Sequence, residues 1–530
     1  MSNIIDLENL NLLHSFFLKS SKLYPDNYAL SIENNKWTYS EIEDKARCWA
    51  NVLLKNTNNS LSRVGVFGNK SYTAYVGVLS SLFSGATYVP LNEKFPKERT
   101  LSMINQAELD AIIVDEQSFP ILEEMISFLE KPLLILCPDT IINKSLNCNI
   151  TIFDKNALEN SEPLEVLPEV NEDSFAYLLF TSGSTGKPKG APIAHKNAAS
   201  FLKYNLNKYK FAPEDKFTQT FDLTFDLSVF DLFMSWGCGG CLCVMPPIQL
   251  VLSPFRFIKE HGVTVWFSVP SIISLYRKKK SLKPDCLPTL KWSLFCGEAL
   301  TQSSVEAWHK AAPQSKIENL YGPTELTIAC ASYSWNEDSS SRECTNGLVP
   351  IGKVFNTLDS IVVDENNIPV NDGEAGELCV SGPQMFSGYL NNEEQTLKRF
   401  VEIESKKYYK TGDMVKLEKD HYIYLGRMDH QIKVQGFRIE LGEIESVIRF
   451  NDNVIEAAAI PWPIVDGEAQ GLVAFVSGNN INVDELMETC KAHLPYYMNP
   501  NRIYILKDVP YNSNGKIDYN ALKRRLSEGC

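Results

Sequence analysis

A loop at residues 178–190 has the composition of a polyphosphate site. An apolar run gives way there to hydroxyls, glycines and lysines, in the order Leu178-Leu-Phe-Thr-Ser-Gly-Ser-Thr-Gly-Lys-Pro-Lys-Gly190. Glycines let the backbone approach a bulky anion, while amide N–H groups and turn hydroxyls donate hydrogen bonds to it. Lys187 and Lys189 add positive charge. The alternative is a surface linker, although a linker seldom follows so apolar a strand.

The loop is not a Walker A motif. That pattern needs a glycine five residues before its Gly-Lys pair and Ser or Thr after the lysine. Thr181 and Pro188 occupy those two positions. A phosphate-loop kinase is therefore disfavoured.

Four further motifs follow the loop in order. They are Asn319-Leu-Tyr-Gly-Pro-Thr-Glu325, Tyr409-Lys-Thr-Gly-Asp413, the segment 426–445 and Asn514-Gly-Lys-Ile-Asp518. Together, the five motifs resemble those of adenylate-forming enzymes: the acyl-CoA synthetases, the luciferases and the adenylation domains of nonribosomal peptide synthetases. Segment 426–445 is most similar to the peptide-synthetase branch.

The resemblance implies an α/β protein with two domains. These are a large N-terminal domain of several subdomains, residues 1–428, and a small mobile α+β lid, residues 429–530. A chain of 530 residues is also too long for one ordinary core. Asp429 occupies the family's hinge position, with an ordinary surface aspartate as the alternative.

Periodicity predicts the elements that position the motifs. Up to residue 425, helical and strand patterns alternate, as in layered α/β proteins. Residues 39–53 have helical period, and residues 64–67 and 111–115 read as buried strands. The C-terminal part is expected to contain a helix at 441–450, strands at 454–460 and 472–476, and a helix at 484–494.

Bulk properties restrict the class of protein. The chain is 44% hydrophobic and 22% charged, as globular proteins are. A formal net charge of −14 argues against nucleic acid or an anionic membrane as the main partner. No signal peptide or membrane-spanning run is visible. The 13 cysteines form an odd number, so we expect reduced thiols in the cytoplasm.

The segment Cys238-Gly-Gly-Cys241-Leu-Cys243 has spacing suited to zinc or redox chemistry. No second cysteine pair lies nearby to complete a four-ligand site. The segment reads as a helix that ends at glycines and turns into a buried strand. We therefore expect these thiols to be packed in the core.

The resemblance implies a reaction that joins a carboxylate to ATP and releases pyrophosphate. Both reactants are anions, so a lysine and a magnesium ion are suitable catalysts. Lys516 matches the lysine that bridges the carboxylate and the phosphate oxygens. Thr324 matches an α-phosphate contact, and Glu325 matches the carboxylate that holds magnesium. For Lys516 the alternative is a plain tail lysine.

The expected cofactors are ATP and Mg²⁺. The residues expected at the nucleotide are Thr181, Ser182, Gly183, Ser184, Thr185, Gly186, Lys187, Gly297, Asn319, Tyr321, Asp413 and Arg427. By the resemblance, Tyr321 stacks on adenine and Asp413 accepts both ribose hydroxyls. The alternatives are a turn at residues 322–323 and a helix cap for Asp413.

Asp226 matches the aspartate with which peptide-synthetase adenylation domains bind an α-amino group; acyl-CoA synthetases lack it. A carboxylate in an apolar pocket costs several kcal/mol unless a cation joins it. An ammonium substrate supplies that cation. The alternatives are a helix cap or confusion with Asp222 or Asp231. The rest of the expected substrate wall consists of Leu227, Phe230, Ser268, Leu294, Cys296, Leu320, Ile328 and Ala329.

This mostly apolar wall favours a compact apolar amino acid. It is similar to that of the free-standing enzymes that adenylate L-proline in pyrrole and anatoxin-type pathways. Ser268, Cys296 and Ala329 depart from that pattern, so cysteine or a small aliphatic amino acid remains an alternative. An acyl- or aryl-CoA ligase is the other enzyme class to consider.

The resemblance also implies a second step. Adenylates of this family pass to a phosphopantetheine thiol after the lid rotates, and Gly436 matches a residue that lines the pantetheine channel. The sequence ends soon after Lys516. We therefore expect a separate carrier protein as partner, with no role for nucleic acid or membrane. A silent scaffold protein is disfavoured because Lys516, Glu325 and Asp413 are all present.

Overall fold

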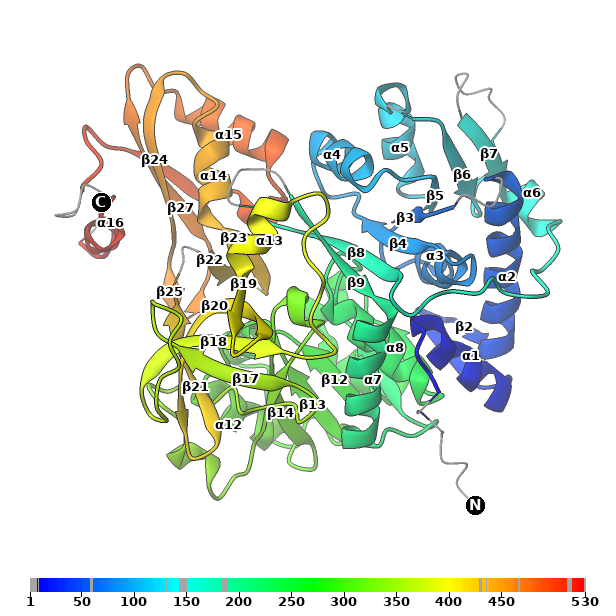
Figure 1. Cartoon of the computed structure of the whole chain (residues 1–530), viewed down its shortest axis with the longest axis horizontal. Helices are drawn as coiled ribbons and strands as arrows, with labels where there is room; N and C mark the ends of the chain where they lie inside the picture. Colours follow the sequence, from blue (N-terminus) through cyan, green and yellow to red (C-terminus); the bar gives the residue numbers. More distant parts are fainter. Residues whose placement is uncertain are drawn as a thin grey trace.

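The computed structural model describes most of the chain. Its described residues are 7, 9–57, 61–129, 131–142, 150–183, 188–428, 431–434, 436–465, 468–511 and 517–528. The fold is mixed α/β, as predicted, with two large sheets, a smaller sheet and a C-terminal part (Figure 1). The helices are α1 (Leu13–Leu23), α2 (Tyr39–Asn56), α3 (Tyr72–Phe83), α4 (Lys97–Ala107), α5 (Phe119–Met125), α6 (Lys155–Glu159), α7 (His195–Tyr209), α8 (Leu227–Gly237), α9 (Pro247–Leu252), α10 (Pro254–His261), α11 (Ser271–Lys278), α12 (Gln302–Ala311), α13 (Glu393–Arg399), α14 (Leu441–Ile448), α15 (Val483–His493) and α16 (Tyr519–Ser527).

A seven-stranded sheet carries the phosphate loop. Its strands are parallel except the last pair, which is antiparallel. In order, they are β7 (Ile150–Asp154), β6 (Leu133–Cys137), β5 (Ala111–Val114), β3 (Arg63–Phe67), β4 (Thr87–Leu91), β8 (Phe175–Thr181) and β9 (Lys189–Ala194). The predicted strands at 64–67 and 111–115 are β3 and β5. The loop follows β8 and precedes β9.

A nine-stranded sheet carries most of the other motifs. In order, its strands are β16 (Lys353–Val354), β15 (Ala331–Ser334), β14 (Lys316–Tyr321), β13 (Trp292–Phe295), β12 (Val265–Ser268), β10 (Lys216–Gln219), β11 (Cys241–Val244), β1 (Tyr28–Ile32) and β2 (Asn35–Thr38). The run from β14 to β1 is parallel. The carboxyl ends of β10, β13 and β14 therefore lie at one edge, where ligands bind in open α/β sheets.

The main core lies around helices packed between the two large sheets. Every residue of α8 is buried, which fits a helix that is apolar all round. The helix predicted at 39–53 is α2, whose start is fixed by a reciprocal cap between Thr38 and Glu41. The cysteine-rich segment is packed as expected: Cys238, Cys241 and Cys243 are buried and unbridged.

A smaller antiparallel sheet holds the second nucleotide motif. Its strands are β17 (Asp359–Val363), β18 (Ala375–Ser381), β20 (Lys406–Glu418), β19 (Phe400–Ile403) and β21 (His421–Arg427). In the β20–β21 ladder, Asp413 is paired with Arg427. Two residues from separate motifs are therefore neighbours across one strand pair.

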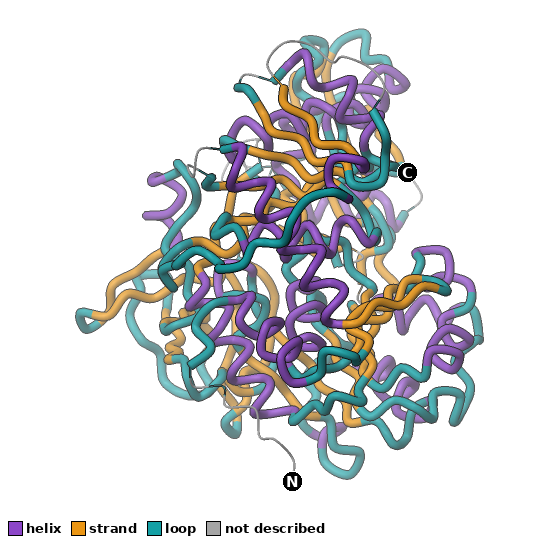
Figure 2. The backbone as a smooth tube through the Cα atoms, turned by 90° about the vertical axis from the view of Figure 1, so that its right-hand side faces the viewer, coloured by secondary structure: helices purple, strands orange, loops and turns teal. Residues whose placement is uncertain are grey.

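The C-terminal part contains two further sheets. The first orders β23 (Phe437–Glu440), β22 (Gln431–Val434), β26 (Glu468–Ala469) and β25 (Ile464–Val465). The second orders β24 (Val454–Pro461), β27 (Leu472–Gly478) and β28 (Arg502–Ile505). The predicted strands at 454–460 and 472–476 are β24 and β27, and the predicted helices are α14 and α15. Figure 2 shows the two termini far apart on the molecule.

The β24–β27–β28 sheet has two apolar faces. Ala457 and Ala459 pack in one cluster with α14 and α15, whereas Ala458 and Ile460 pack in another with α16. This follows from the period-two alternation of strand side chains. The α14 face adjoins the N-terminal part, and α16 lies at the outer edge, away from the seven-stranded sheet (Figure 1).

Candidate active site

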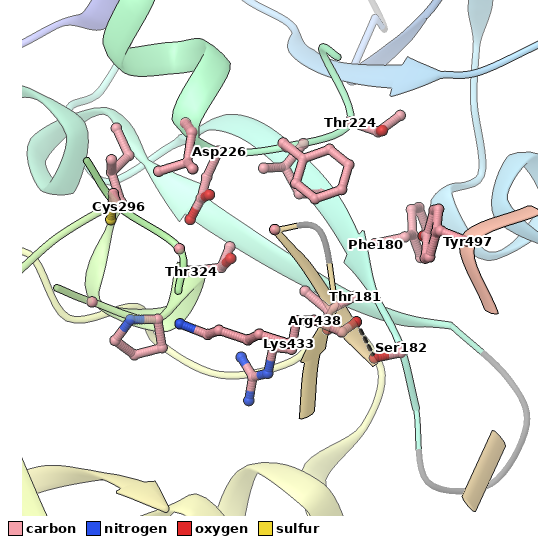
Figure 3. Close-up of a pocket in the computed structure, with 18 of the residues that line it drawn as sticks. Phe180, Thr181, Ser182, Thr224, Asp226, Cys296, Thr324, Lys433, Arg438 and Tyr497 are labelled. Carbon is pink, nitrogen blue, oxygen red and sulfur yellow. Dashed lines mark hydrogen bonds between the residues drawn. The ribbon is translucent and has the colours of Figure 1, made fainter. Parts of the chain in front are cut away.

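A cavity opens where the carboxyl ends of β10, β13 and β14 meet the end of β8 and the β22–β23 hairpin. Figure 3 shows Asp226 and Cys296 on one side, and the side chains of Lys433 and Arg438 on the other. The cavity is lined by Phe95, Leu179, Phe180, Thr181, Ser182, Thr224, Phe225, Asp226, Leu227, Cys296, Gly297, Gly322, Pro323, Thr324, Ile328, Asp413, Arg427, Lys433, Gly436, Arg438 and Tyr497. Four of the five motifs contribute to it.

Asp226 presents its carboxylate to this cavity. It stands at the N-cap of α8, but its side chain makes no capping bond. Burial raises its pKa to about 6, with further upward pressure from Glu325, against a hydrogen bond with Thr324 and the positive charge of Lys433. The helix-cap alternative is therefore wrong. The carboxylate instead faces a space that a cation can share.

Three of the predicted substrate residues line the cavity beside Asp226: Leu227, Cys296 and Ile328. Four others are buried in the core and do not reach its surface: Phe230, Leu294, Leu320 and Ala329. In this arrangement none of the four lines the cavity, contrary to the prediction that they face the ligand. One helical turn after Asp226, the Phe230 ring packs 4.5 Å from the ring of Phe267. These residues form the layer of the core behind the cavity wall.

Ser268 lies in a second cavity instead. Its hydroxyl accepts a hydrogen bond from Trp266 Nε1 at 2.9 Å and donates one to Val269 O at 3.2 Å. The second cavity is lined by Asn69, Lys70, Lys94, Thr220, Phe221, Asp222, Phe225, Pro247, Leu250, Ser268, Val269, Ile272, Gly436, Phe437 and Tyr496. Phe225 and Gly436 line both cavities, so the two spaces adjoin at these residues.

Asp413, Arg427 and Tyr321 form a hydrogen-bonded group at the other end. Arg427 Nη1 donates to Asp413 Oδ1 at 2.8 Å, and the Tyr321 hydroxyl donates to Asp413 Oδ2 at 2.5 Å. Asp413 lies within β20, so the helix-cap alternative fails here too. A carboxylate held by two donors keeps lone pairs free for further donors, such as ribose hydroxyls.

An adjoining cavity extends past this group and is lined by Asn319, Tyr321, Asp413 and Arg427 among others. The Asn319 amide donates to Pro350 O at 2.9 Å, while its buried carbonyl oxygen accepts nothing from the residues described. Buried acceptors are seldom left without a donor. An exocyclic amino group of a purine would supply that donor.

Gly297 and Gly322 are two positions near the cavity where the backbone needs glycine. Gly297 has φ +96°, in the left-handed region. A Cβ at Gly322 would lie 2.5 Å from Ala329 Cα, so the motif backbone packs directly on the segment that follows it. This contact fixes the loop that carries Thr324 and Glu325.

Glu325 is buried and strongly paired. Its carboxylate accepts from the Tyr389 hydroxyl at 2.6 Å and from Arg438 Nη1 at 3.1 and 2.9 Å. Burial alone would raise its pKa, but Arg438 and Tyr389 hold the pKa at about 2. An ionised carboxylate is a suitable oxygen ligand for Mg²⁺. Glu325 therefore fits the predicted metal role once Arg438 moves away.

The start of the phosphate loop is bound to the C-terminal part. Ser182 Oγ donates to Arg438 O at 3.0 Å, and the Gly183 amide donates to Glu443 Oε2 at 3.1 Å. Glu443 also accepts from Arg99 Nη1 at 2.5 Å, which links it to α4. Thr181 and Ser182 line the cavity. The predicted contacts Ser184, Thr185, Gly186 and Lys187 lie outside the described residues.

Two further predictions fall outside the described residues: Asp429 and Lys516. Ile517, which follows Lys516, packs against the apolar cluster between α16 and the β24–β27–β28 sheet. Neither Tyr511 nor Ile517 lines any of the three cavities. Within the C-terminal part, the β22–β23 hairpin contributes Lys433, Gly436 and Arg438 to the cavity lining.

Gly436 lies at the tip of that hairpin, between β22 and β23. It has φ +84°, and a Cβ there would lie 2.4 Å from Val269 Cγ1. Its amide donates to Glu298 Oε1 at 2.7 Å, and Glu298 Oε2 accepts from the Ser271 amide at 3.0 Å. The sequence did not reveal Glu298 or Tyr389, because each lies far along the chain from the motif residue to which it is hydrogen-bonded.

The comparisons with known proteins agree with this geometry. The model of the AMP-binding enzyme family matches residues 17–390, and that of the AMP-binding enzyme C-terminal domain matches residues 443–516. The chain belongs to the AMP-binding enzyme family. The proposed boundary at residue 428 falls between the two matched segments.

Solved structures and curated members of this family resemble most of the chain. The adenylation domain AlmE of Vibrio cholerae, solved with glycyl-adenosine-5'-phosphate, is 32% identical with a TM-score of 0.87, over 100% of this chain and 99% of that one. The D-alanine--D-alanyl carrier protein ligase of Bacillus licheniformis is 28% identical over 96% of this chain and 98% of its own length. Gramicidin S synthase 1 of Brevibacillus brevis is 30% identical over 96% of this chain, which spans 44% of that relative.

Two other classes of site find no support in the residues that the structure describes. None of the helices there combines the length and apolar character needed to cross a bilayer. Within the same residues, no cluster of three or more His, Cys, Asp or Glu side chains is arranged to hold a metal ion.

Proposed function

We propose that this protein is an amino-acid adenylating ligase. It activates a small apolar amino acid with ATP to an aminoacyl adenylate, and transfers the aminoacyl group to the phosphopantetheine thiol of a separate carrier protein. The observation that carries the proposal is the Asp226 carboxylate, whose pKa is raised to about 6 in a cavity that also reaches Asp413 and Arg427. A plain carboxylic acid would leave that half-buried carboxylate with only the partial compensation of Lys433 and no cation from the substrate.

In the first step, Asp226 binds the substrate ammonium and Thr324 contacts the α-phosphate. Asp413 and Arg427 hold the ribose, and the unsatisfied Asn319 oxygen accepts from the adenine amino group. The amino-acid carboxylate oxygen attacks the α-phosphorus, an O–P bond forms, and the bond to pyrophosphate breaks. Glu325 would hold magnesium, which offsets the negative charge of the triphosphate when bound.

Lys516 is proposed to stabilise this step by bridging the two anions. The arrangement described here has the β22–β23 hairpin at the cavity and Ile517 on the outer face of the lid sheet. We propose that a rotation of the lid, with Asp429 as hinge, presents Lys516 to the reacting atoms in the first step. The two lid arrangements separate the two steps in time.

In the second step, the thiol reaches the adenylate through the second cavity. Its sulfur attacks the acyl carbon, a thioester forms, the bond from carbon to the phosphate oxygen breaks, and AMP leaves; the thiol proton passes to solvent. Gly436 lines both cavities, and because a Cβ there would lie 2.4 Å from Val269 Cγ1, glycine lets the hairpin reach their junction.

The cavity favours a compact substrate. Leu227, Cys296 and Ile328 supply the apolar wall, and Phe230 fills the space behind it without exposure. L-proline is the specific prediction; cysteine or a small aliphatic amino acid such as glycine or alanine is the alternative. The similar proteins whose names mention glycyl adenylate and D-alanine support the small end of this range.

ATP–pyrophosphate exchange across the twenty amino acids, D-alanine, fatty acids and aryl acids tests the proposal. We expect exchange with one or a few small apolar amino acids and none with the acids that lack an amine. Exchange driven by a fatty or aryl acid, followed by thioester formation only on coenzyme A, would establish an acyl- or aryl-CoA ligase instead.

A further inference from the structure

The second cavity opens beside a short helix with an unusual surface. Pro247 and Leu250 of α9 line this cavity, as does Ile272 of α11. The helix α9 spans only Pro247–Leu252 and has no buried residue. Both helices therefore border the route by which a thiol would reach the adenylate.

Three large apolar side chains of α9 face solvent. Ile248 is 64% exposed, Val251 41% and Leu252 68%. Single exposed apolar residues are normal on protein surfaces, but a group of them beside a ligand channel marks an interaction site. These three side chains lie within five positions, and the residues described leave much of their surface exposed.

Positive charge lies next to these apolar residues. Lys279 Nζ donates to Val251 O at 2.8 Å, and the Tyr276 hydroxyl donates to Leu250 O at 2.7 Å, so the end of α11 is fixed against α9. Lys278 and Lys280 are exposed beside it. Residues 245–259 and 271–284 contain no Asp or Glu, although the whole chain has a formal net charge of −14.

The cavity mouth adds one more cation. Lys94 is exposed and lines the second cavity together with Tyr496 from the lid. The acidic neighbour in this lining, Asp222, accepts hydrogen bonds from Asn92 and Thr224. A thiol that enters here therefore meets an apolar contact surface bordered by lysines, which suits an acidic partner.

We propose that α9 and the end of α11 form the docking surface for the carrier protein. Ile248, Val251 and Leu252 contact an apolar patch on an acidic carrier, and Lys278 and Lys280 face the acidic residues around that patch. The apolar contact supplies affinity, and the charges supply orientation and association rate. This inference deepens the proposed function and rests on it.

The test compares acceptors that need docking with one that does not. The variants are Ile248→Glu with Leu252→Glu, and Lys278→Glu with Lys280→Glu. The matched controls are Ile368→Glu, an exposed apolar residue elsewhere, and Lys398→Glu, a lysine on α13. The acceptors are a panel of phosphopantetheinylated acidic carrier proteins and free pantetheine, with the amino acid found by exchange.

We expect each docking variant to lower kcat/KM for carrier aminoacylation at least tenfold, mainly through KM. Exchange and transfer to free pantetheine should change less than twofold, and the control variants should leave all three rates unchanged. Raised salt should slow transfer by the wild type and have less effect on the double lysine variant. Unchanged carrier transfer in both docking variants would overturn the inference.

Three further outcomes also decide the matter. If free pantetheine is aminoacylated but no carrier in the panel is, or if the α9 variants turn a dimer into a monomer without slowing transfer, the docking assignment is wrong. If no amino acid supports exchange at all, the proposed function fails before docking is reached. The two failures are thus separate observations.

Discussion

Arg438 Nη1 lies 2.9 Å from the carboxylate of Glu325, so a residue of the lid hairpin occupies the carboxylate assigned to magnesium. The two residues are 113 positions apart; Arg438 lines the cavity, and Glu325 is buried directly after the lining residue Thr324. With Arg438 in place, Glu325 has its charge already compensated. In the proposed mechanism, magnesium and this position of the hairpin compete for one carboxylate.

Replacing Arg438 with alanine should slow transfer more than adenylation. The variant leaves a buried carboxylate without its cation, a change that costs about 3–5 kcal/mol in buried pairs. That cost falls only on the hairpin-in arrangement, so we expect at least a tenfold drop in transfer to free pantetheine. Pyrophosphate exchange should fall by less than about threefold.

The two rates measured on the same preparation give the answer, and Arg438→Lys, which keeps the charge, should recover part of the transfer rate. Equal losses in both rates would show that Arg438 does not act through the lid position.

Asp226→Asn should raise the KM of the amino acid in exchange by about 100-fold, because a neutral amide cannot compensate a buried ammonium. The KM of ATP should change little. Asp222→Asn is the matched control, since that carboxylate lies in the second cavity. An Asp226→Asn enzyme with wild-type amino-acid KM would contradict the substrate role of this residue.

Amino-acid binding should weaken as the pH falls below about 6. Burial raises the pKa of Asp226 to about 6, so protonation below that value removes the charge that attracts the ammonium. We expect the amino-acid KM to rise by about tenfold for each pH unit below this point. Glu325, with its pKa at about 2, stays ionised over this range. A flat KM between pH 5 and 8 would show that Asp226 is already ionised in the free enzyme.

The sequence predicted the charged motif residues of the site more accurately than the apolar wall of the substrate cavity. Asp226 and Arg427 line the cavity because the first follows β10 and the second ends β21, whereas Asp413 lines it from within β20, opposite Arg427. The wall was less accurate. Phe230 has the right spacing from Asp226, but the rotation of α8 directs its ring into the core toward Phe267.

Long-range partners could not be predicted at all. Tyr389 supports Glu325 from 64 positions away, and Glu298 holds Gly436 across 138 positions. No local pattern encodes such pairs, since they depend on how separate sheets pack. The exposed face of α9 was equally hidden, because the apolar run at residues 248–252 reads like part of a core helix.

Gly436→Val should block transfer more strongly than adenylation. A Cβ at this position would lie 2.4 Å from Val269 Cγ1, and the backbone has φ +84°, which β-branched residues rarely adopt. A valine would therefore push the hairpin away from the junction of the two cavities. We expect transfer to free pantetheine to drop at least 100-fold and exchange less than tenfold; Val269→Ala in the same chain should restore part of the transfer. Loss of exchange to the same degree would indicate misfolding of the hairpin.

Lys516→Ala should abolish adenylate formation while ATP binding is largely kept. The lysine is assigned to the charge that develops between the carboxylate and the α-phosphate, whereas Asp413, Arg427 and Tyr321 hold the nucleoside. Exchange should fall by about 1,000-fold or more, with the Kd of ATP, measured by calorimetry, within about threefold of wild type. Lys523→Ala, on α16 close by in the chain, is the control.

A synthetic aminoacyl adenylate supplied to the Lys516→Ala enzyme should still be transferred to pantetheine, because that step uses the hairpin instead. Wild-type exchange in this variant would remove Lys516 from the mechanism.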